Sequence, residues 1–451
     1  MSTALIILAA GQGTRMNSDI PKVLHQIGSA PMLVHAMRAG QVLAPDHTVI
    51  VVGHEGETVA KAALEFDEDA LIVPQDKQLG TAHAVAQAAP ALAGHKGDAV
   101  VLYGDTPFIQ PQTLARMAEA REAHDIVVLG FVAKDPGRYG RLVMQGESLE
   151  KIVEFKDADA DERSIDFCNS GIIMAKSGVL FNLITAVDCT NAAGEYYLTD
   201  IIAIARARGF TATAVSCDEA ETMGINSRTE LAKAEAAFQA RARAAALEDG
   251  ITMPAPETVF FAYDTVIGRD AVIEQNVVFG PDVTIESGAR IRAFSHLEGC
   301  HVSRGAIVGP FARLRPGAEL AEDSRVGNFV EVKNAVIDEG AKINHLSYIG
   351  DAFVGKASNI GAGTITCNYD GVMKHRTKIG ARAFIGSNTM LIAPVSVGDE
   401  AMTASGSVIN KDVPDGAMAV ARAPQVNKPG FARKLFEMLK SKKAKRDKGA
   451  G

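Results

Sequence analysis

Residues 265–298 read TVIGRDAVIEQNVVFGPDVTIESGARIRAFSHLE, and a large apolar residue recurs in them at every sixth position. The recurring residues are Ile267, Ile273, Phe279, Ile285, Ile291 and Leu297. A period of six fits neither the 3.6-residue period of an α-helix nor the alternation of one long strand. We interpret each hexad as a short strand plus a corner, so that three hexads form one solenoid coil of about 18 residues.

This ladder continues almost to the end of the chain, with phase slips after Leu297, Val332 and Ile349. Its later members are Val308, Leu314, Leu320, Val326, Val332, Ile337, Ile343, Ile349, Val354, Ile360, Thr366, Ile379, Ile385, Leu391, Val397, Thr403 and Ile409. Stacked coils would bury these side chains in one aliphatic column, and we expect only glycine and small residues at the corners. The long step from Thr366 to Ile379 holds a loop, TCNYDGVMKHRTK, and such loops commonly carry function.

The amino-terminal half has a different pattern, in which short apolar runs alternate with stretches of helical periodicity. The predicted strands are Ala4–Leu8, Thr48–Val52, Ala70–Val73, Ala99–Tyr103 and Ile126–Phe131, and the predicted helices are Pro31–Leu43, Thr81–Leu92 and Pro111–Ala123. This alternation predicts a Rossmann-like α/β domain with a mostly parallel sheet, which binds ligands beyond the carboxyl ends of its strands. A capping box at Ser227–Glu230 opens an Ala-rich helix. We therefore expect a domain at 1–227, a linker helix at 228–249 and a solenoid domain at 250–451.

Composition excludes several classes of protein. No apolar run approaches the ~20 residues of a membrane helix, so we expect no membrane insertion. Five cysteines without a CxxC pair argue against disulfides and for the cytoplasm. Residues 428–451 hold nine Lys or Arg against Glu437 and Asp447, a net charge of +7, which leaves −15 for the rest of a chain with total charge −8. So acidic a body would repel nucleic acid, and we expect the basic tail to be a solvated, frayed terminus.

A first chemical motif follows the first predicted strand. Residues 8–16 read LAAGQGTRM, and Pro21-Lys22-Val23 comes soon after. Backbone N–H groups of a glycine-rich turn can approach a triphosphate closely, and Arg15 adds a fixed positive charge. The segment is not a Walker loop, and Met16 replaces the third glycine of GxGxxG. It resembles the nucleotidyltransferases that make nucleoside-diphosphate sugars.

That resemblance implies attack of a sugar 1-phosphate on the α-phosphorus of UTP, with Arg15 and Lys22 as catalytic cations beside Mg²⁺. By the same resemblance, Asp105 and Asn226 are the metal ligands, and Gln75 with Gly80-Thr81 reads the uracil. The implied residues for binding UTP and UDP-N-acetylglucosamine are Leu8, Ala9, Ala10, Gly11, Lys22, Gln75, Gly80, Thr81, Tyr103, Gly104, Asp105, Gly140, Glu154, Asn169 and Asn226.

A second motif set lies on the ladder, where FARLRP, GNFVEVKN, NHLSYIGD and NIGAGTITCNYDG concentrate polar residues between 311 and 371. A solenoid wall that served only for packing would not need so many polar residues. The ladder resembles the left-handed parallel β-helix of the hexapeptide acyltransferases, most of which are trimers, and this implies a homotrimer. The polar segments resemble the acetyltransferase half of the bifunctional enzymes that make UDP-N-acetylglucosamine. The amino-terminal motifs match the same family, so the resemblance covers essentially the whole chain.

The implied reaction transfers acetyl from acetyl-CoA to the amine of glucosamine 1-phosphate. An ammonium cannot attack a thioester, and His345, with an ordinary imidazole pKa near 6.5, is suited to remove its proton. The resemblance assigns Arg315, Lys333, Tyr348 and Asn359 to the sugar phosphate, and Ala362, Asn368, Tyr369, Ser387, Ser405 and Arg422 to acetyl-CoA. Asn344 and Ser405 depart from the expected Gly and Ala. The product, N-acetylglucosamine 1-phosphate, is the substrate of the first site, in a pathway to peptidoglycan and lipopolysaccharide.

Other functions predict different features. A single-activity nucleotidyltransferase whose solenoid only assembles or senses effectors would need neither Lys333 nor His345. A γ-type carbonic anhydrase would use the HxxxxH spacing of His296 and His301 for zinc, together with a third histidine upstream on the column. The sequence has no histidine between His124 and His296. A purely structural scaffold leaves both motif sets unexplained.

Overall fold

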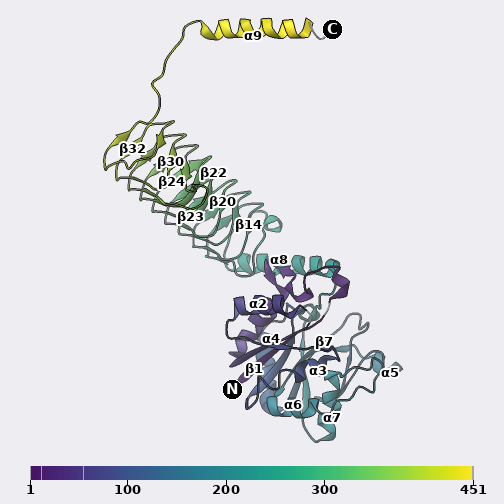
Figure 1. The fold of residues 1–451 in the computed structure, drawn as a ribbon. Helices are drawn as coiled ribbons and strands as arrows, with labels where there is room; N and C mark the ends of the chain where they lie inside the picture. The colour runs from purple at the N-terminus through teal and green to yellow at the C-terminus, as the bar shows by residue number, and fades with distance from the viewer. Residues whose placement is uncertain (1, 12, 54, 449–451) are drawn as a thin grey trace. The chain divides into compact units, whose positions relative to one another are not determined.

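The computed structural model describes residues 2–11, 13–53 and 55–448 (Figure 1). The chain forms two compact units. The first extends to Glu248 and also includes Phe260–Thr265 and Phe279–Asp282. The second comprises Asp249–Val259, Val266–Val278 and the chain from Val283 onward.

The first unit is built on one sheet with the strand order β11-β7-β10-β6-β1-β4-β5. Its strands are β1 (Thr3–Ala9), β4 (His47–Val52), β5 (Leu71–Pro74), β6 (Asp98–Tyr103), β7 (Ile126–Val132), β8 (Arg141–Gln145), β9 (Ser148–Val153), β10 (Phe167–Lys176) and β11 (Ala212–Cys217), with a small separate pair β2 (Gln26–Ile27) and β3 (Ala30–Pro31). All five predicted strands form, and β1 pairs in parallel with β4 and β6. The sequence analysis missed β10, which lies antiparallel between β6 and β7, the edge strand β11 beside β7, and the hairpin of β8 and β9.

Helices cover both faces of this sheet. They are α1 (Met32–Gly40), α2 (Gly56–Phe66), α3 (Thr81–Ala86), α4 (Pro111–Ala123), α5 (Ala160–Arg163), α6 (Ser177–Ile184), α7 (Ile201–Ala207) and α8 (Arg228–Glu248). Alternate residues of β1 pack into two cores, one with α3, α6 and α7 and the other with α1, α2 and α4. Burial on both faces explains why the strands read as continuous apolar runs. The predicted helix at 81–92 ends early, at Ala86, because Pro90 cannot continue a regular helix.

The start of α8 is fastened by its own side chains. Ser227 Oγ accepts a hydrogen bond from the Glu230 N–H at 3.2 Å, as the predicted capping box requires. The Glu230 carboxylate accepts from the Asn226 N–H at 2.7 Å rather than from Ser227. This contact holds the backbone of Asn226 at the edge of the site described below.

The second unit is a solenoid of parallel strands. Its 9-stranded face contains β13 (Val272–Ile273), β16 (Arg290–Ile291), β19 (Ile307–Val308), β22 (Arg325–Asn328), β24 (Lys342–His345), β26 (Asn359–Ile360), β29 (Phe384–Ile385), β32 (Met402–Thr403) and β34 (Met418–Ala419). The remaining strands form a 14-stranded sheet with β12 (Val266–Ile267), β14 (Val278–Phe279), β15 (Val283–Ile285), β17 (His296–Leu297), β18 (Cys300–Val302), β20 (Arg313–Leu314), β21 (Ala318–Leu320), β23 (Glu331–Ile337), β25 (Tyr348–Val354), β27 (Ile365–Cys367), β28 (Thr377–Ile379), β30 (Met390–Ile392), β31 (Val395–Val397) and β33 (Val408–Ile409). Val266 pairs with Thr284, eighteen residues later, which confirms the predicted coil length.

The ladder residues form the predicted buried column. Ile273, Ile291 and Ile343 are 0% exposed. The phase slip after Leu297 proves to be a five-residue step to Val302, a fully buried member that the sequence analysis missed. Coils of 17 residues result from such steps, as in the pairing of Cys300 with Val283.

The prediction that only small residues occupy the corners is wrong. Phe294, Phe311 and Phe329 lie at corners with φ between 55° and 60°. Their rings stack from coil to coil, with centroids 4.9 and 5.3 Å apart, and each ring is about half exposed. Bulky residues fit because the side chain at this corner position points out to solvent. The only cost is the backbone strain of the left-handed region.

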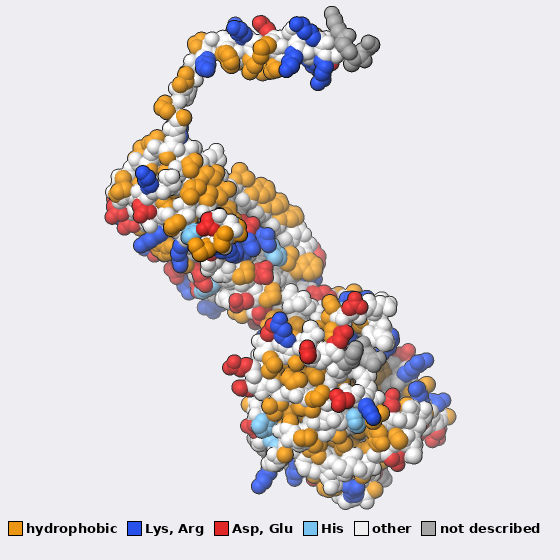
Figure 2. Space-filling view, in the orientation of Figure 1, with side chains coloured by type: hydrophobic (Ala, Val, Ile, Leu, Met, Phe, Trp, Pro, Cys, Tyr) orange, Lys and Arg blue, Asp and Glu red, His pale blue; other side chains and the backbone are white. Residues whose placement is uncertain are grey.

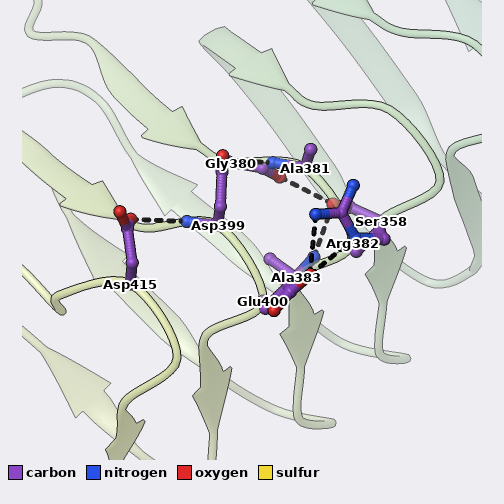
Figure 3. Close-up of polar contacts among 8 residues, drawn as sticks. All are labelled: Ser358, Gly380, Ala381, Arg382, Ala383, Asp399, Glu400 and Asp415. Atoms are coloured by element: carbon purple, nitrogen blue, oxygen red, sulfur yellow. Dashed lines mark hydrogen bonds and ion pairs between the residues drawn. The ribbon is translucent and has the colours of Figure 1, made fainter.

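Other corners are tied by polar groups from the adjoining coil (Figure 3). The buried Ser358 hydroxyl donates to the Gly380 carbonyl at 2.7 Å and accepts from the Ala383 N–H at 2.8 Å. Asp399 accepts from the Ala381 N–H at 2.7 Å, and Asp415 repeats this contact one coil later with the Asp399 N–H at 2.8 Å. These hydrogen bonds satisfy backbone donors that the short strands leave unpaired.

The basic tail is more regular than predicted. The frayed terminus expected there is, over Phe431–Lys448, the helix α9. Its side chains from Phe431 to Asp447 lie exposed, with basic groups along the helix (Figure 2). Among the described residues, no helix combines the length and the apolar character needed to cross a membrane.

Ile343→Ala should destabilise the solenoid by about 2–5 kcal/mol, since it leaves a cavity in the column. Ile343 is fully buried on β24, whereas the neighbouring Lys342 is exposed. Thermal or urea unfolding of the two variants measures this difference, with Lys342→Ala as the matched control. Equal stability of the two variants would contradict the column.

Candidate functional site

Four side chains from separate segments meet beyond the carboxyl end of β6. Asp105 follows β6, Lys22 lies in a short 3₁₀ turn after β1, and Asn226 lies two residues before α8. The Lys22 ammonium contacts the Asp105 carboxylate and donates to Asn226 Oδ1 at 3.0 Å. Arg15 also donates to Asn226 Oδ1, at 2.9 Å. The structure therefore brings together the two predicted catalytic cations and the two predicted metal ligands.

A cavity of about 320 Å³ opens beside this cluster. Nine predicted nucleotide-binding residues line it: Leu8, Ala10, Gly11, Lys22, Gln75, Gly80, Thr81, Tyr103 and Asp105. Gln78 and Glu195 line it too and were missed, because neither belongs to a motif that the sequence analysis used. Ala9 instead packs in the core below, where it is 5% exposed.

The wall of this cavity at Gly80 tolerates no side chain. Gly80 has φ +116°, and a Cβ there would lie 2.5 Å from the Tyr196 carbonyl oxygen. The buried Gln75 side chain donates toward the Gly80 carbonyl at 3.4 Å and contacts His83 Nδ1 at 3.0 Å. The amide of Gln75 is thus fixed in the position from which a base edge could be read.

Gly80→Ala is expected to raise the KM for UTP at least tenfold, because the loop must shift to admit the methyl group. Gly94→Ala is the matched control, since Gly94 also has positive φ but has nothing within 4 Å of an added Cβ. An unchanged KM in Gly80→Ala would show that the loop does not shape the nucleotide site.

Tyr103 links this cavity to a second group of predicted residues. Burial, together with the nearby carboxylates of Asp105 and Glu154, raises the pKa of Tyr103. Burial also raises the pKa of Glu154. A Cβ on Gly140 would lie 3.3 Å from Glu154 Oε1, and the Gly140 carbonyl accepts from the Asn169 N–H at 2.9 Å. Gly140, Glu154 and Asn169 are therefore one cluster, as predicted for the sugar.

The Asp105–Asn226 pair fits a magnesium ion. Both side chains offer oxygen donors, which Mg²⁺ prefers, and one or two such ligands plus substrate phosphates are usual for it. Both oxygens already converge on one cation, the Lys22 ammonium. No cluster of three or more His, Cys, Asp or Glu that could hold a metal occurs within the described part of the chain.

In the second unit, His345 stands in a row of predicted residues along one corner. The strand pairs Ile343–Ile360, Ile360–Ile385 and Ile385–Thr403 set the register of four coils. The residue two positions after each paired residue lies in one row, with one residue per coil. The row consists of His345, Ala362, Ser387 and Ser405. With strands about 4.8 Å apart, the row is about 14 Å long. The predicted base therefore heads the predicted acetyl-CoA contacts.

A basic group is formed by Arg315, Lys333 and Lys374, and Figure 2 shows Lys and Arg side chains gathered on part of the solenoid surface. Arg315 donates to Glu331 Oε1 at 2.8 Å. The positive charge of the nearby Lys374 lowers the pKa of Lys333. Lys374 belongs to the loop that leaves the repeat; only that loop, not the residue, was singled out from the sequence.

Tyr348 and Asn368 lie beside this basic group. A Cβ on Gly350 would lie 2.4 Å from the Tyr348 hydroxyl and 2.9 Å from Asn368 Nδ2, so both groups sit over this glycine. Asp351 accepts hydrogen bonds from Asn368 and, at 2.6 Å, from Asn334. These bonds outweigh the opposing effect of partial burial and lower the pKa of Asp351. Asp351 was not predicted, and it orients Asn368.

Three predicted residues lie outside these contacts. Asn359 is on β26, next to Lys342 of β24. Tyr369 is 61% exposed, and its hydroxyl donates to the Gly371 carbonyl at 2.6 Å. Arg422 is exposed beyond β34.

Comparison with known proteins agrees with both halves. A MobA-like NTP transferase domain matches residues 5–166, and a bacterial transferase hexapeptide pattern of six repeats matches 264–299. The "Bifunctional protein GlmU" of Ruegeria sp. (strain TM1040) is 69% identical over 449 residues, covering 100% of both chains. The chain belongs to the GlmU family. The GlmU protein of Jannaschia sp. (strain CCS1) is 63% identical over 445 residues, covering 99% of this chain and 98% of that one.

Membership of the GlmU family settles the choice among the functions considered above. The chain is a bifunctional enzyme of UDP-N-acetylglucosamine biosynthesis, with a uridylyltransferase and a glucosamine-1-phosphate acetyltransferase. An NTP-transferase fold in the first half and hexapeptide repeats in the second are the two folds that the GlmU family joins. The carbonic anhydrase alternative also lacks structural support, since His301 pairs with Glu286 at 3.0 Å and not with His296.

Proposed function

We propose that the residues assembled in each unit are the two active sites of this GlmU protein, one per activity. The observation that carries this proposal is the convergence of Arg15, Lys22, Asp105 and Asn226 in one unit and the row headed by His345 in the other. The acetyl transfer comes first, because its product is the acceptor in the uridylyl transfer.

In the first unit, the triphosphate would lie over the glycine turn, with the uracil toward Gln75 and Gly80. Arg15 and Lys22 would neutralise the charge that gathers on the transferring and leaving phosphates, since such transfers rely on positioning and electrostatics. Mg²⁺ would supply further charge neutralisation there, with Asp105 and Asn226 as its protein ligands. Lys22 would then exchange its contact with Asp105 for one with phosphate. Glu154 and Asn169 would hold the sugar of N-acetylglucosamine 1-phosphate.

In the second unit, the cationic group of Arg315 and Lys333 would clamp the phosphate of glucosamine 1-phosphate, and the missed Lys374 would add a third positive charge. Tyr348 and Asn359 would place the sugar. His345 would take a proton from the substrate ammonium, so that the neutral amine can attack the thioester carbon. Acetyl-CoA would extend along Ala362, Ser387 and Ser405, with Asn368, Tyr369 and Arg422 as further contacts.

A metal titration tests the first site. Removal of divalent cations by EDTA should abolish uridylyl transfer and leave acetyl transfer unchanged in the same preparation, because only Asp105 and Asn226 are assigned to a metal. Added Mg²⁺ should restore the lost activity. Loss of both activities, or of neither, would contradict the assignment.

We also propose a homotrimer that works in the cytoplasm. Support comes from the resemblance to trimeric hexapeptide acyltransferases and from the exposed apolar strip of Phe294, Phe311 and Phe329, which association would cover. Light scattering after size exclusion should give three times the monomer mass of 47.5 kDa. A monomer with full acetyl transfer would contradict it.

A further inference from the structure

The side chain of Asn328 makes the only hydrogen bond to the His345 ring within the described residues. Asn328 Oδ1 lies 2.6 Å from His345 Nδ1. Asn328 ends β22 and His345 ends β24, and the two residues are direct partners in the register of these neighbouring strands. Asn328 therefore extends the row of His345, Ala362, Ser387 and Ser405 by one coil at the end opposite Ser405.

The backbone around the pair leaves it little freedom. A Cβ on Gly327 would lie 2.0 Å from the Asn344 carbonyl oxygen, so the two strands approach here as closely as only glycine allows. The Leu346 N–H donates to the Asn328 carbonyl at 3.0 Å. The Ser347 hydroxyl donates to the His345 carbonyl at 2.9 Å. Both side chains thus start from fixed backbone positions.

We infer that Asn328 is a positioning residue, which holds His345 in the tautomer with the proton on Nδ1 and the basic lone pair on Nε2. The inference rests on the proposed role of His345 as the base. An amide oxygen only accepts hydrogen bonds, so the ring nitrogen facing it must carry a proton. With the amide reversed, its NH₂ group would donate to Nδ1, and the proton would then sit on Nε2, where it blocks the base.

The charged groups near the His345 ring do not fix its tautomer. Besides His345, the ionisable side chains of β22 and β24 are Arg325 and Lys342, both exposed. The neighbouring β26 carries none, and across the corner β23 and β25 begin with Glu331 and Tyr348. Glu331 is engaged by Arg315. No carboxylate of the described residues is hydrogen-bonded to the ring, so the ring faces a neutral amide.

Two substitutions test this inference. Asn328→Leu keeps the approximate shape but removes the acceptor, and it should lower kcat for acetyl transfer about 10- to 100-fold, with KM values within about twofold. Asn328→Asp keeps the acceptor and adds a charge that favours the imidazolium, so the acidic limb of the pH–kcat profile should move up by about one pH unit. At high pH this variant should approach wild-type activity.

The controls separate this inference from the proposed base. Asn276→Asp adds the same charge at a corner of an early coil. An aspartate is tolerated there, because Asp270 and Asp282 also adopt positive φ at neighbouring corners. This variant should not shift the pH–kcat profile. Asn328→Leu added to His345→Ala should cause no further loss, because Asn328 acts only through the ring. Thermal unfolding checks that each variant keeps a folded solenoid.

Each contrary outcome has its own meaning. If His345→Ala is inactive but both Asn328 variants keep the wild-type rate and pH profile, the positioning role is overturned and the base remains. If Asn328→Leu is slow, Asn328→Asp shifts no profile and the double variant loses further activity, Asn328 is only structural and the inference is overturned. If His345→Ala acetylates at the wild-type rate, the base assignment itself fails.

Discussion

His345→Ala should reduce acetyl transfer by about 10²- to 10⁴-fold, the usual contribution of a general base, and leave uridylyl transfer unchanged. The reason is chemical, since the substrate amine is mostly protonated near neutral pH and an ammonium has no lone pair to attack a thioester. The ring heads the row of residues that we assign to acetyl-CoA. Coupled assays of thiol release and of pyrophosphate release on one preparation measure both activities.

His296→Ala is the matched control for this experiment. His296 is an exposed histidine on β17 of the same solenoid, outside the proposed site. It should keep both activities, although the carbonic anhydrase interpretation gives His296 a functional role. Wild-type acetylation by His345→Ala, or equal loss in the two variants, would contradict the role of His345.

Asp105→Ala should have the complementary effect, a loss of uridylyl transfer on the order of 10³-fold with acetyl transfer intact. The substitution removes the carboxylate that contacts Lys22 in the cluster of Arg15, Lys22 and Asn226. It takes away a proposed metal ligand and also frees Lys22 to pair elsewhere. Release of pyrophosphate from UTP in the presence of N-acetylglucosamine 1-phosphate is the measurement.

Asp69→Ala is the control for general charge effects, because Asp69 is an exposed aspartate of the same unit. Excess Mg²⁺ should restore only part of the activity of Asp105→Ala, since Asn226 remains as a ligand. If Asp105→Ala kept full uridylyl transfer, the carboxylate would have no part in the mechanism. If its acetyl transfer fell, the two sites would not be separate.

The features that follow from periodicity could be read from the sequence. The six-residue ladder fixes which side chains are buried, because inward and outward positions alternate in each short strand. Ile343 and Ile360 were placed correctly on this basis. The continuous apolar runs of β1 and β6 likewise required a sheet covered on both faces. The motif residues Lys22 and Asp105 then had to meet at one edge of that sheet.

The features that depend on tertiary contacts could not be read from the sequence. The antiparallel β10 resembles any other apolar run, and its direction depends on the path of the chain around the sheet. Lys374 belongs to a loop outside the repeat, and its charge acts on Lys333 only in the folded chain. Phe311 was unexpected at a corner because stacking on Phe294 and Phe329 has no signature within one hexad. Asn328 and His345 are neighbours only through the register of adjacent coils.

The central claim is that one chain carries two independent active sites joined only by a diffusing intermediate. The most direct test supplies glucosamine 1-phosphate, acetyl-CoA, UTP and Mg²⁺ to His345→Ala, to Asp105→Ala and to a mixture of the two, and measures UDP-N-acetylglucosamine. We predict that neither variant makes the product at an appreciable rate alone and that the mixture does. A mixture as inactive as its components would contradict the claim.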